Sequence, residues 1–517
     1  MNDTTARAHG NETVARARRN TVGDALRRAA RLQRDATALI FADRRWSFAE
    51  LDVAADRVAR RFADLGLRPG DRIAAYGRNS DAYFLAWLGC IRGGFVHVPV
   101  NYALTGEELA YIIRQSGARL VLSAGSLEAN LDGITVEFRG RFEGGGPLDV
   151  LAVAQDPDAP VGVDPALEED TLAQIVYTSG TTAAPKGAMM THRAMLAQYY
   201  SCIHNMDYAG TDVALAALPL YHTAQMHAFT MPQLLVGART ILIEAPQPAQ
   251  VLELIERERI TSFFAPPTVW ISLLRHPDFA TRDLSSLEKV YYGASIMPVP
   301  VLQELRQRLP KARPYNAYGQ TEIAPVATIL RPEEHDARPA SCGRPVLNVE
   351  TRVVDPDMND CAPGVHGEVV HRSPQLLSGY WDKPEETAAA FAGGWFHSGD
   401  VGFFDEEGYL YIVDRIRDVI NTGGVLVASR EVEEALFTHP AVSEVAVVGL
   451  PDDKWIEAVS AFVVLRPGHE ADEATLIAHA RQHLAPFKLP KKVVFVDTLP
   501  RNTAGKLLKR ELRRTYA

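Results

Sequence analysis

The sequence has 517 residues, of which 47% are hydrophobic and 23% are charged, and its formal net charge is -10. This length exceeds one compact domain, so we expect at least two domains with sizeable cores. The negative charge argues against a protein whose main partner is nucleic acid or an anionic membrane, because both need a basic surface.

The cysteines and the N-terminal segment bear on the compartment. Cys90, Cys202, Cys342 and Cys361 are scattered and include no C-x-x-C pair, which favours reduced thiols over a zinc site or a disulfide framework. Residues 1–20 are polar and rich in Arg and Ala. We expect a disordered tail there rather than a secretory signal, no membrane-spanning segment further on, and a cytoplasmic protein.

Helix-like and strand-like segments alternate from the first expected helix onward. Ser47 with Glu50, and Thr105 with Glu108, each have the spacing of a helix-capping box. The expected segments are helices at 51–62, 82–92 and from 105, with strands at 73–76, 95–100 and 120–122. This alternation predicts an α/β domain with a largely parallel sheet.

The same alternation returns later and then changes. A helix at 251–259 and strands at 261–265, 289–292 and 314–318 continue the α/β pattern. From Gly367 short strands and turns predominate, which indicates a small β-barrel-like part. After Arg415 we expect a small α+β unit, with helices from 429 and from 474 and strands at 445–448, 461–464 and 493–496. The predicted domains are residues 21–415 and 416–517.

A loop rich in hydroxyls and glycines follows the apolar run at 172–176. It reads Tyr-Thr-Ser-Gly-Thr-Thr-Ala-Ala-Pro-Lys-Gly over residues 177–187. Polyphosphate needs many donors and a close backbone approach, and such a loop supplies both. The spacing is neither the Walker pattern nor the Rossmann glycine pattern. Composition alone leaves a phosphate loop and a polar surface loop both open.

This loop resembles the signature loop of the adenylate-forming superfamily, which contains acyl- and aryl-CoA synthetases, peptide-synthetase adenylation domains and beetle luciferases. Ala183 replaces the usual glycine. Five further blocks follow in the order of that superfamily, namely residues 218–222, 292–295, 318–322, 395–400 and 500–506. The resemblance covers residues 21–514, and it implies a large adenylating domain followed by a small mobile one.

The resemblance implies a role for each matching residue. Lys506 is expected to stabilise the transition state of adenylation, since a carboxylate must attack an already anionic phosphorus. Glu322, helped by Thr178, would hold Mg²⁺ against ATP, and His222 would lie at the mouth of the acyl pocket. The expected nucleotide-binding residues are Thr178, Ser179, Gly180, Thr181, Thr182, Lys186, Gly293, Ala294, Ser295, Tyr318, Gly319, Gln320, Thr321, Asp400 and Arg415.

Some of these roles are more specific. Tyr318 would stack on adenine, Asp400 would accept hydrogen bonds from the ribose, and Arg415 would approach the ribose or the phosphates. The small domain is expected to rotate about Arg417 between two half-reactions. It would first present Lys506, and then the loop with Gly423 and Gly424 for the thiol of CoA.

The resemblance leaves the acid and the acceptor open. A carboxylic acid, fatty or aryl, with ATP, Mg²⁺ and CoA is the leading interpretation. The pocket candidates are Tyr221, His222, Met226, His227, Phe264, Trp270 and Met297. Val425 and Leu426 follow the two glycines where relatives often have a polar pair, so a carrier protein, an amine, or nitrite activation for diazotisation stays an alternative. A non-catalytic nucleotide-binding protein is disfavoured because Lys506 and Glu322 are both present. We expect no nucleic-acid partner, and a homodimer is possible.

Overall fold

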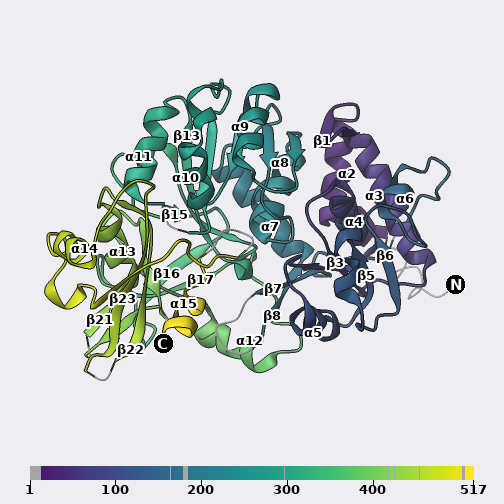
Figure 1. Ribbon diagram of the computed structural model, residues 1–517. Helices are drawn as coiled ribbons and strands as arrows, with labels where there is room; N and C mark the ends of the chain where they lie inside the picture. The colour runs from purple at the N-terminus through teal and green to yellow at the C-terminus, as the bar shows by residue number, and fades with distance from the viewer. Residues whose placement is uncertain are drawn as a thin grey trace.

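The structure is a computed structural model that describes residues 13–163, 165–178, 184–295, 297–416, 418–423, 425–452, 454–502 and 507–517. Two large sheets with their helices form the main body, and a smaller unit at the C-terminal end of the chain lies to one side (Figure 1). The predicted α/β class with a large N-terminal part and a small α+β part is confirmed.

The first large sheet has six strands in the order β6-β5-β3-β4-β7-β8. All neighbouring pairs are parallel except β7 and β8, which form an antiparallel hairpin. Its strands are β3 (Arg72–Tyr76), β4 (Val96–Val100), β5 (Ala118–Ser123), β6 (Phe138–Arg141), β7 (Leu172–Thr178) and β8 (Lys186–Thr191). Its helices are α3 (Phe48–Asp64), α4 (Asp81–Gly93), α5 (Gly106–Ser116) and α6 (Val150–Gln155).

Two predicted caps have different outcomes. The Ser47 box is confirmed, because its hydroxyl accepts from the Glu50 amide and the Glu50 side chain accepts from the Ser47 amide. The Thr105 cap is wrong, since its side chain makes no capping bond. Gly106 has a φ of 54°, so the backbone at this helix start lacks the geometry that brings a capping hydroxyl to the amides of the first turn.

The second large sheet has nine strands in the order β15-β14-β13-β12-β11-β9-β10-β1-β2. The run from β13 to β1 is parallel, and the edges are antiparallel. The strands are β1 (Thr37–Phe41), β2 (Arg44–Ser47), β9 (Val213–Ala216), β10 (Arg239–Leu242), β11 (Ser262–Phe264), β12 (Lys289–Gly293), β13 (Arg313–Gly319), β14 (Val326–Leu330) and β15 (Arg344–Pro345). The helices of this region are α7 (His192–Asn205), the π-helix η2 (Ala224–Thr230), α8 (Met231–Leu235), α9 (Pro248–Arg257), α10 (Pro267–Arg275) and α11 (Val299–Arg308).

The expected β-rich part is a four-stranded antiparallel sheet. It consists of β16 (Glu350–Val354), β17 (Gly367–Arg372), β18 (Phe396–Phe404) and β19 (Leu410–Arg415), with α12 (Pro384–Ala390) before β18. Its strand β19 ends at Arg415, the last residue of the predicted large domain.

The small C-terminal unit has its own sheet and its own core. Its strands are β20 (Ile420–Thr422), β21 (Val425–Val427), β22 (Val442–Asp452), β23 (Ile456–Leu465) and β24 (Lys492–Phe495). Its helices are α13 (Ser429–Phe437), α14 (Glu473–Ala480) and α15 (Lys509–Tyr516). Val432, Leu436, Val447, Val459 and Leu476 are fully buried in its core. Because that core is separate, it fits the domain boundary predicted after Arg415, and residues 416–419 between β19 and β20 are the predicted link.

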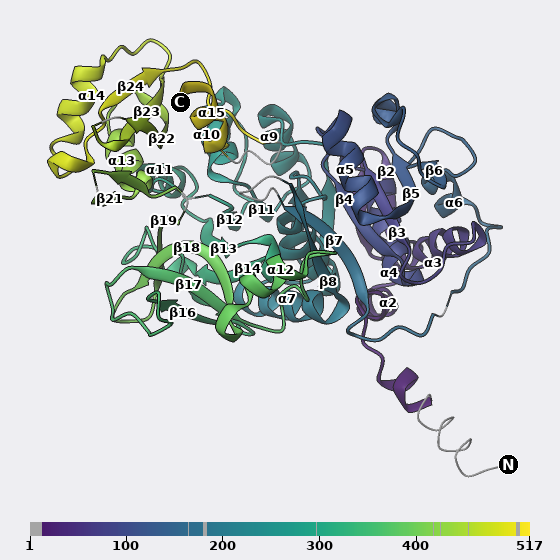
Figure 2. The ribbon, with the colours of Figure 1, turned by 90° about the horizontal axis from the view of Figure 1, so that it is seen from below.

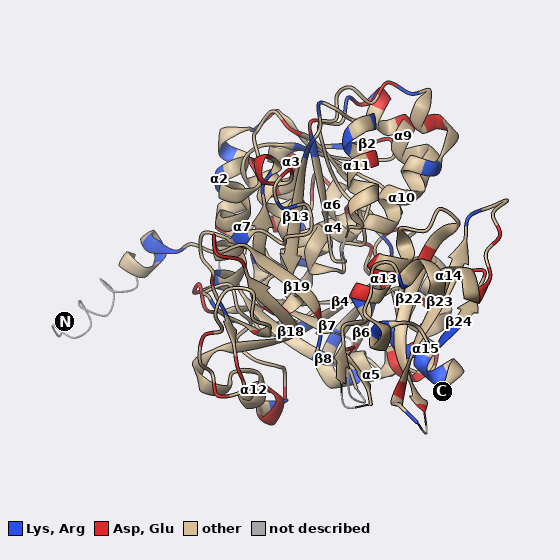
Figure 3. Ribbon diagram, turned by 90° about the vertical axis from the view of Figure 1, so that its left-hand side faces the viewer, with Lys and Arg blue, Asp and Glu red and all other residues tan. Residues whose placement is uncertain are grey.

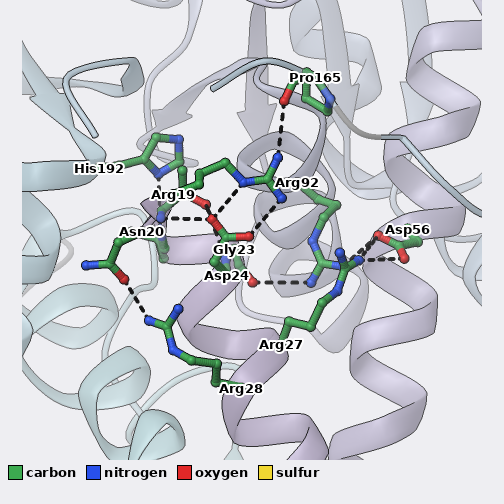
Figure 4. Close-up of polar contacts among 12 residues, drawn as sticks. Arg19, Asn20, Gly23, Asp24, Arg27, Arg28, Asp56, Arg92, Pro165 and His192 are labelled. Atoms are coloured by element: carbon green, nitrogen blue, oxygen red, sulfur yellow. Dashed lines mark hydrogen bonds and ion pairs between the residues drawn. The ribbon is translucent and has the colours of Figure 1, made fainter. Parts of the chain in front are cut away.

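The N-terminal segment is anchored to the body at α2 (Val22–Leu32). Residues 13–18 are helical and extend away from the rest of the described chain (Figure 2). Arg19 pairs with Asp24, and Asp24 completes a capping box with Thr21 (Figure 4). Of the expected disordered tail, residues 1–12 lie outside the described residues.

Several compositional expectations can be compared with the structure. Cys90, Cys202, Cys342 and Cys361 all lie in described ranges and are free thiols. Basic and acidic residues are interspersed on most elements, and α15 carries several of the basic ones (Figure 3). Over the described ranges, none of the helices is both long and apolar enough to cross a membrane.

Candidate active site

The expected phosphate loop closes the hairpin of β7 and β8. Thr178 at the end of β7 is paired with Lys186 at the start of β8. Both flanking residues are therefore held by strand pairing at the base of the loop. Ser179, Gly180, Thr181 and Thr182 lie outside the described residues, so their predicted contacts with phosphate stay predictions.

Glu322 lies beside this hairpin. It belongs to the short helix η4 (Thr321–Ile323) after β13 and is buried. Its Oε1 accepts a hydrogen bond from the Thr178 hydroxyl at 3.3 Å. The two residues expected to bind the metal are 144 positions apart in the sequence, and the structure brings their oxygens together.

Tyr380 also contacts Glu322, and sequence reasoning missed it. Its hydroxyl donates to Glu322 Oε1 at 3.2 Å, and the Lys186 ammonium lies 5.1 Å from the centre of its ring. Burial, and then the charge of Glu322, raise the pKa of its phenol, so the hydroxyl remains a donor. Tyr380 lies in the loop after β17, and no hydrophobic periodicity or motif spacing in the sequence singles it out.

A second group of predicted residues meets where the ends of β13 and β19 lie beside the middle of β18. The Tyr318 hydroxyl donates to Asp400 Oδ2 at 2.7 Å, and Arg415 Nε is 3.3 Å from Asp400 Oδ1. Asp400 and Arg415 are opposite each other in the sheet. Burial and the Asp400 charge raise the pKa of Tyr318 well above its usual value. This arrangement brings a carboxylate, an aromatic ring and a guanidinium together at one place.

Two glycines allow the backbone to approach closely around these side chains. A Cβ on Gly293 would lie 2.2 Å from the Ala317 carbonyl oxygen, and one on Gly319 would lie 1.9 Å from the Pro325 carbonyl oxygen. Neither position can accept a side chain without a backbone shift. Ala294 and Ser295 are exposed after β12. The hydroxyl oxygens of Thr321 and Thr223 are 3.4 Å apart. Gln320, which follows Gly319 and precedes η4 in the sequence, is half-buried.

The expected acyl pocket residues are distributed among different cores. His222 is half-buried, with its ring 4.5 Å from that of Tyr221. Tyr221 and Met226 pack in one hydrophobic cluster, Phe264 in a second, and Trp270 and Met297 in a third. His227 is fully buried and bonds to Gln174 and Tyr199. The candidates therefore pack in different clusters, and the acyl pocket that they were expected to line stays a prediction.

Gly423 lies in the loop between β20 and β21. Its φ is 65°, which favours glycine, and its amide donates to the Trp455 carbonyl at 2.6 Å. Gly424, Arg417 and Lys506 lie outside the described residues, so the thiol loop, the pivot and the catalytic lysine stay predictions.

The donor set at Glu322 is of the kind that suits Mg²⁺. A carboxylate and a hydroxyl are hard oxygen ligands, and Mg²⁺ usually takes one or two protein oxygens together with substrate phosphates. The described residues contain no cluster of three or more His, Cys, Asp and Glu that could hold an ion. The carboxylate and the hydroxyl suit a metal that is bound mainly through the phosphates of ATP.

Comparison with known proteins agrees with this geometry. Residues 26–381 match the family model "AMP-binding enzyme", and residues 431–506 match "AMP-binding enzyme C-terminal domain". A feruloyl-CoA synthase from an Amycolatopsis species is 36% identical, over 95% of this chain and 98% of the relative. A ligase from Mycobacterium tuberculosis, named for CoA and a methyl-dioxo-octahydroindenyl propanoyl group, is 37% identical over the same shares.

Solved structures show the same similarity. The anthranilate CoA ligase AuaEII in complex with anthranoyl-AMP has a TM-score of 0.90 and 26% identity, covering 96% of this chain and 97% of that one. The amide bond synthetase McbA from Marinactinospora thermotolerans has a TM-score of 0.86 and 29% identity, covering 96% and 100%. The first family model alone covers more than half of the 517 residues. This chain belongs to the AMP-binding enzyme family and is an adenylate-forming acid–thiol ligase.

Proposed function

We propose that this enzyme joins a ring-bearing carboxylic acid to CoA. In the first step the acid attacks the α-phosphorus of ATP, giving an acyl-adenylate and pyrophosphate. In the second step the thiol of CoA displaces AMP. The observation that carries the adenylation step is the grouping of Glu322, Thr178 and Lys186 at the phosphate hairpin.

The chain's own residues have separate tasks in the first step. Lys186, at the base of the loop, would contact the outer phosphates, while Asp400 and Tyr318 would hold the ribose and the adenine. Mg²⁺ bound through Glu322 and Thr178 would neutralise part of the phosphate charge. Lys506 would offset the repulsion between the attacking carboxylate and the α-phosphate. His222 would orient the acid at the pocket mouth.

The class of acid is proposed from the relatives. Several carry ring-bearing acids in their names, including a feruloyl-CoA synthase, an indoleacetate–CoA ligase from Aromatoleum aromaticum and a 2-succinylbenzoate–CoA ligase from Geobacillus kaustophilus. A Bacillus subtilis relative at 32% identity is instead a long-chain-fatty-acid–CoA ligase. Among these relatives ring-bearing acids are the larger group, so they are the first substrates to test, with fatty acids as the second class.

CoA as the acceptor is supported by a patch beside Gly423. Trp455 is half-exposed, and the ammonium groups of Lys454 and Lys491 lie 5.0 and 5.1 Å from its ring centre. An aromatic ring with two lysines suits a nucleotide that carries phosphates. The backbone of Trp455 is bonded to Gly423, so this patch adjoins the loop expected to admit the thiol.

A second acceptor is favoured by one specific feature. Val425 and Leu426 are 45% and 69% exposed next to the same loop, and exposed apolar pairs suit protein contacts better than phosphate contacts. One relative is a fatty acid–acyl-carrier-protein ligase from Streptomyces coeruleorubidus, and McbA is an amide bond synthetase. Adenylation with transfer to a carrier protein or an amine is the alternative.

The test measures pyrophosphate and AMP release with ferulic, anthranilic, indoleacetic and palmitic acids and with nitrite. Each is assayed with ATP and Mg²⁺, with CoA present and with CoA omitted. The proposal expects sustained AMP release with a ring-bearing acid only when CoA is present. Turnover with palmitic acid only, or with nitrite only, would contradict the acid class. Adenylate formation that CoA does not accelerate would favour the alternative acceptors. The homodimer and the cytoplasmic location stay predictions from the sequence.

A further inference from the structure

We propose that Tyr380 is a positioning residue that holds Glu322 and Lys186 in place for MgATP. This inference rests on the proposed function, because it takes Glu322 as the carboxylate for the metal and Lys186 as the ammonium for phosphate. Tyr380 lies outside the six blocks that carry the family resemblance, and no role for it follows from them.

Tyr380 contacts both groups with different parts of one side chain. Its hydroxyl donates to Glu322 Oε1 at 3.2 Å, and its ring faces the Lys186 ammonium at 5.1 Å from the ring centre. A rigid aromatic side chain with two rotatable bonds thereby sets the separation between a carboxylate and an ammonium. Without it, the two opposite charges would be free to approach each other directly when ATP is absent.

The two hydroxyls that reach Glu322 act on the same oxygen. Over the described ranges, the hydrogen bonds to its side chain come from Thr178 and Tyr380, and both end on Oε1. Because Oε1 accepts both hydrogen bonds, Oε2 is the oxygen that we expect to bind the cation. Preorganised ligands lose less freedom on binding, which is why outer partners of metal ligands affect metal affinity.

Tyr380 is itself held on three sides. The residues on either side pair with β8, since the Met189 amide donates to the Gly379 carbonyl at 3.0 Å and the Trp381 amide donates to the Gly187 carbonyl at 2.8 Å. The Tyr380 amide donates to the Thr387 hydroxyl at 2.9 Å.

The neighbours of Tyr380 are fixed in the same way. The Leu377 amide donates to the Glu322 carbonyl at 2.8 Å, and the Trp381 indole donates to the Gln115 carbonyl at 3.2 Å. The segment at 377–381 therefore lies along β8 and fixes the phenol against the carboxylate.

The test separates the hydroxyl from the ring. Tyr380→Phe removes only the donor to Glu322, so we expect the Mg²⁺ concentration for half-maximal activity to rise about fivefold to tenfold, the effect of one modest hydrogen bond to a charged group. The KM for the acid should not change. Tyr380→Leu also removes the ring that faces Lys186, so the KM for ATP should rise as well. Binding of Mg²⁺ to the enzyme with a nonhydrolysable ATP analogue, measured by calorimetry, gives the same comparison without turnover.

Tyr409 provides a matched control. Its hydroxyl donates to Glu334 Oε1 at 2.8 Å, and its ring faces the Arg338 guanidinium at 4.1 Å. Tyr409→Phe removes the same group from the same kind of partner, and melting temperatures of all variants check folding. If Tyr380→Phe titrates with Mg²⁺ as Tyr409→Phe does, or weakens Mg²⁺, ATP and acid equally, the inference is wrong.

Glu322→Gln distinguishes this inference from the proposed function. If Glu322→Gln leaves the Mg²⁺ dependence unchanged, the metal role of Glu322 fails, and the inference fails with it. If Glu322→Gln shifts that dependence and Tyr380→Phe does not, the metal role stands and only the positioning role of Tyr380 is overturned.

Discussion

The Asp414 carboxylate accepts two hydrogen bonds from Ser429, from the backbone amide at 2.7 Å and from the hydroxyl at 2.6 Å. Asp414 belongs to β19 of the large part, whereas Ser429 is the first residue of α13 in the small unit. The residue at the helix N-cap, Ala428, has no side-chain cap of its own. The large part therefore caps a helix of the small unit across the link at 416–419.

This cap predicts the behaviour of Asp414→Ala. Loss of a capping carboxylate costs about 1–2 kcal/mol of stability. Because this cap joins the two units, its loss should weaken the contact between them. We expect trypsin to cleave faster near Arg415, monitored by mass spectrometry of the fragments. Asp472 caps α14 within the small unit, so Asp472→Ala is the control that should not expose the link. Equal cleavage in both variants would refute the bridging role.

Lys509 adds an ion pair beside the hydrogen bonds between Asp414 and Ser429. Its ammonium donates to the Ser429 hydroxyl at 2.6 Å and lies 2.8 Å from Glu433 Oε1. Lys509→Met would leave the Glu433 carboxylate without this partner. We expect a loss of about 2 kcal/mol in the free energy of unfolding, less than for a fully buried pair because both side chains keep some exposure.

Denaturant titration measures this loss, and two variants control it. Lys509→Met combined with Glu433→Gln should recover most of the stability, because the unpaired charge is removed. Lys488→Met breaks the more exposed pair with Glu431 and should cost less than about 1 kcal/mol. A double variant no more stable than Lys509→Met would contradict the explanation.

Lys506→Ala should separate the two half-reactions. The lysine is expected to act only while the adenylate forms, so carboxylate-dependent pyrophosphate exchange should fall by about a hundredfold or more. Thioester formation from a supplied acyl-adenylate should be largely spared. Lys492 is exposed on β24, and Lys492→Ala should affect neither half. Equal loss of both half-reactions in Lys506→Ala would exclude this role.

A row of buried, hydrogen-bonded side chains should make the free energy of unfolding depend on pH. His97 bonds to Gln174 at 3.0 Å, Gln174 to His227 at 2.9 Å, and His227 to Tyr199 at 2.7 Å. Burial lowers the pKa of His97 and of His227 to about 3. Below about pH 6.5 the unfolded chain binds protons on these imidazoles and the folded chain does not. Stability should therefore fall as the pH falls from about 6.5 toward 3, by up to about 1.4 kcal/mol per pH unit for each histidine.

His227→Gln is compared with the wild type by the slope of the unfolding free energy against pH, and not by its stability at one pH. One titrating group is removed, so unfolding free energies measured from pH 7 to pH 5 should fall less steeply than in the wild type. His469 is exposed, and His469→Gln should leave the slope unchanged. An unchanged slope in His227→Gln would show that this imidazole does not govern the acid response.

Asp24 stabilises the start of α2, and this contribution should begin to be lost at a lower pH than the one that depends on His97 and His227. Burial alone would raise the pKa of Asp24, but hydrogen bonds from Arg19 and Thr21 lower it below its usual value of 3.8. Such a carboxylate contributes stability above that value and loses it as the pH falls through the lower folded value. Asp24→Asn should cost about 1 kcal/mol at pH 7, with the difference from wild type shrinking below about pH 4.

Thermal unfolding at pH 7, 5 and 3.5 measures this difference. Asp35 is exposed near the end of the same helix, and Asp35→Asn is the control for removal of a negative charge. A cost for Asp24→Asn that stays the same at pH 3.5 would mean that the contact does not depend on the ionised carboxylate.

Local patterns in the sequence predicted many of the helices and strands, because these depend on residues close together in the chain, but they missed α2, β1 and β2, which precede the helix that was expected first. The Ser47 cap follows from spacing alone, as does the helix expected at 51–62, which the structure extends to Phe48–Asp64. Thr105 shows the limit of such patterns, since the left-handed Gly106 next to it changes the backbone path. The same limit applies to the pocket candidates, whose assignment to different cores depends on packing between distant elements.

The sequence by itself determined the family, because the six ordered blocks carry the residues that relatives of this kind are expected to use for ATP. The family pattern also assigned Thr178, Glu322, Asp400 and Arg415 to the site. Only the tertiary structure decided which other residues hold them. Tyr380 is 58 positions from Glu322, and they meet because the segment at 377–381 pairs with β8. Contacts of this kind depend on how separate strands pack, and no local pattern encodes that.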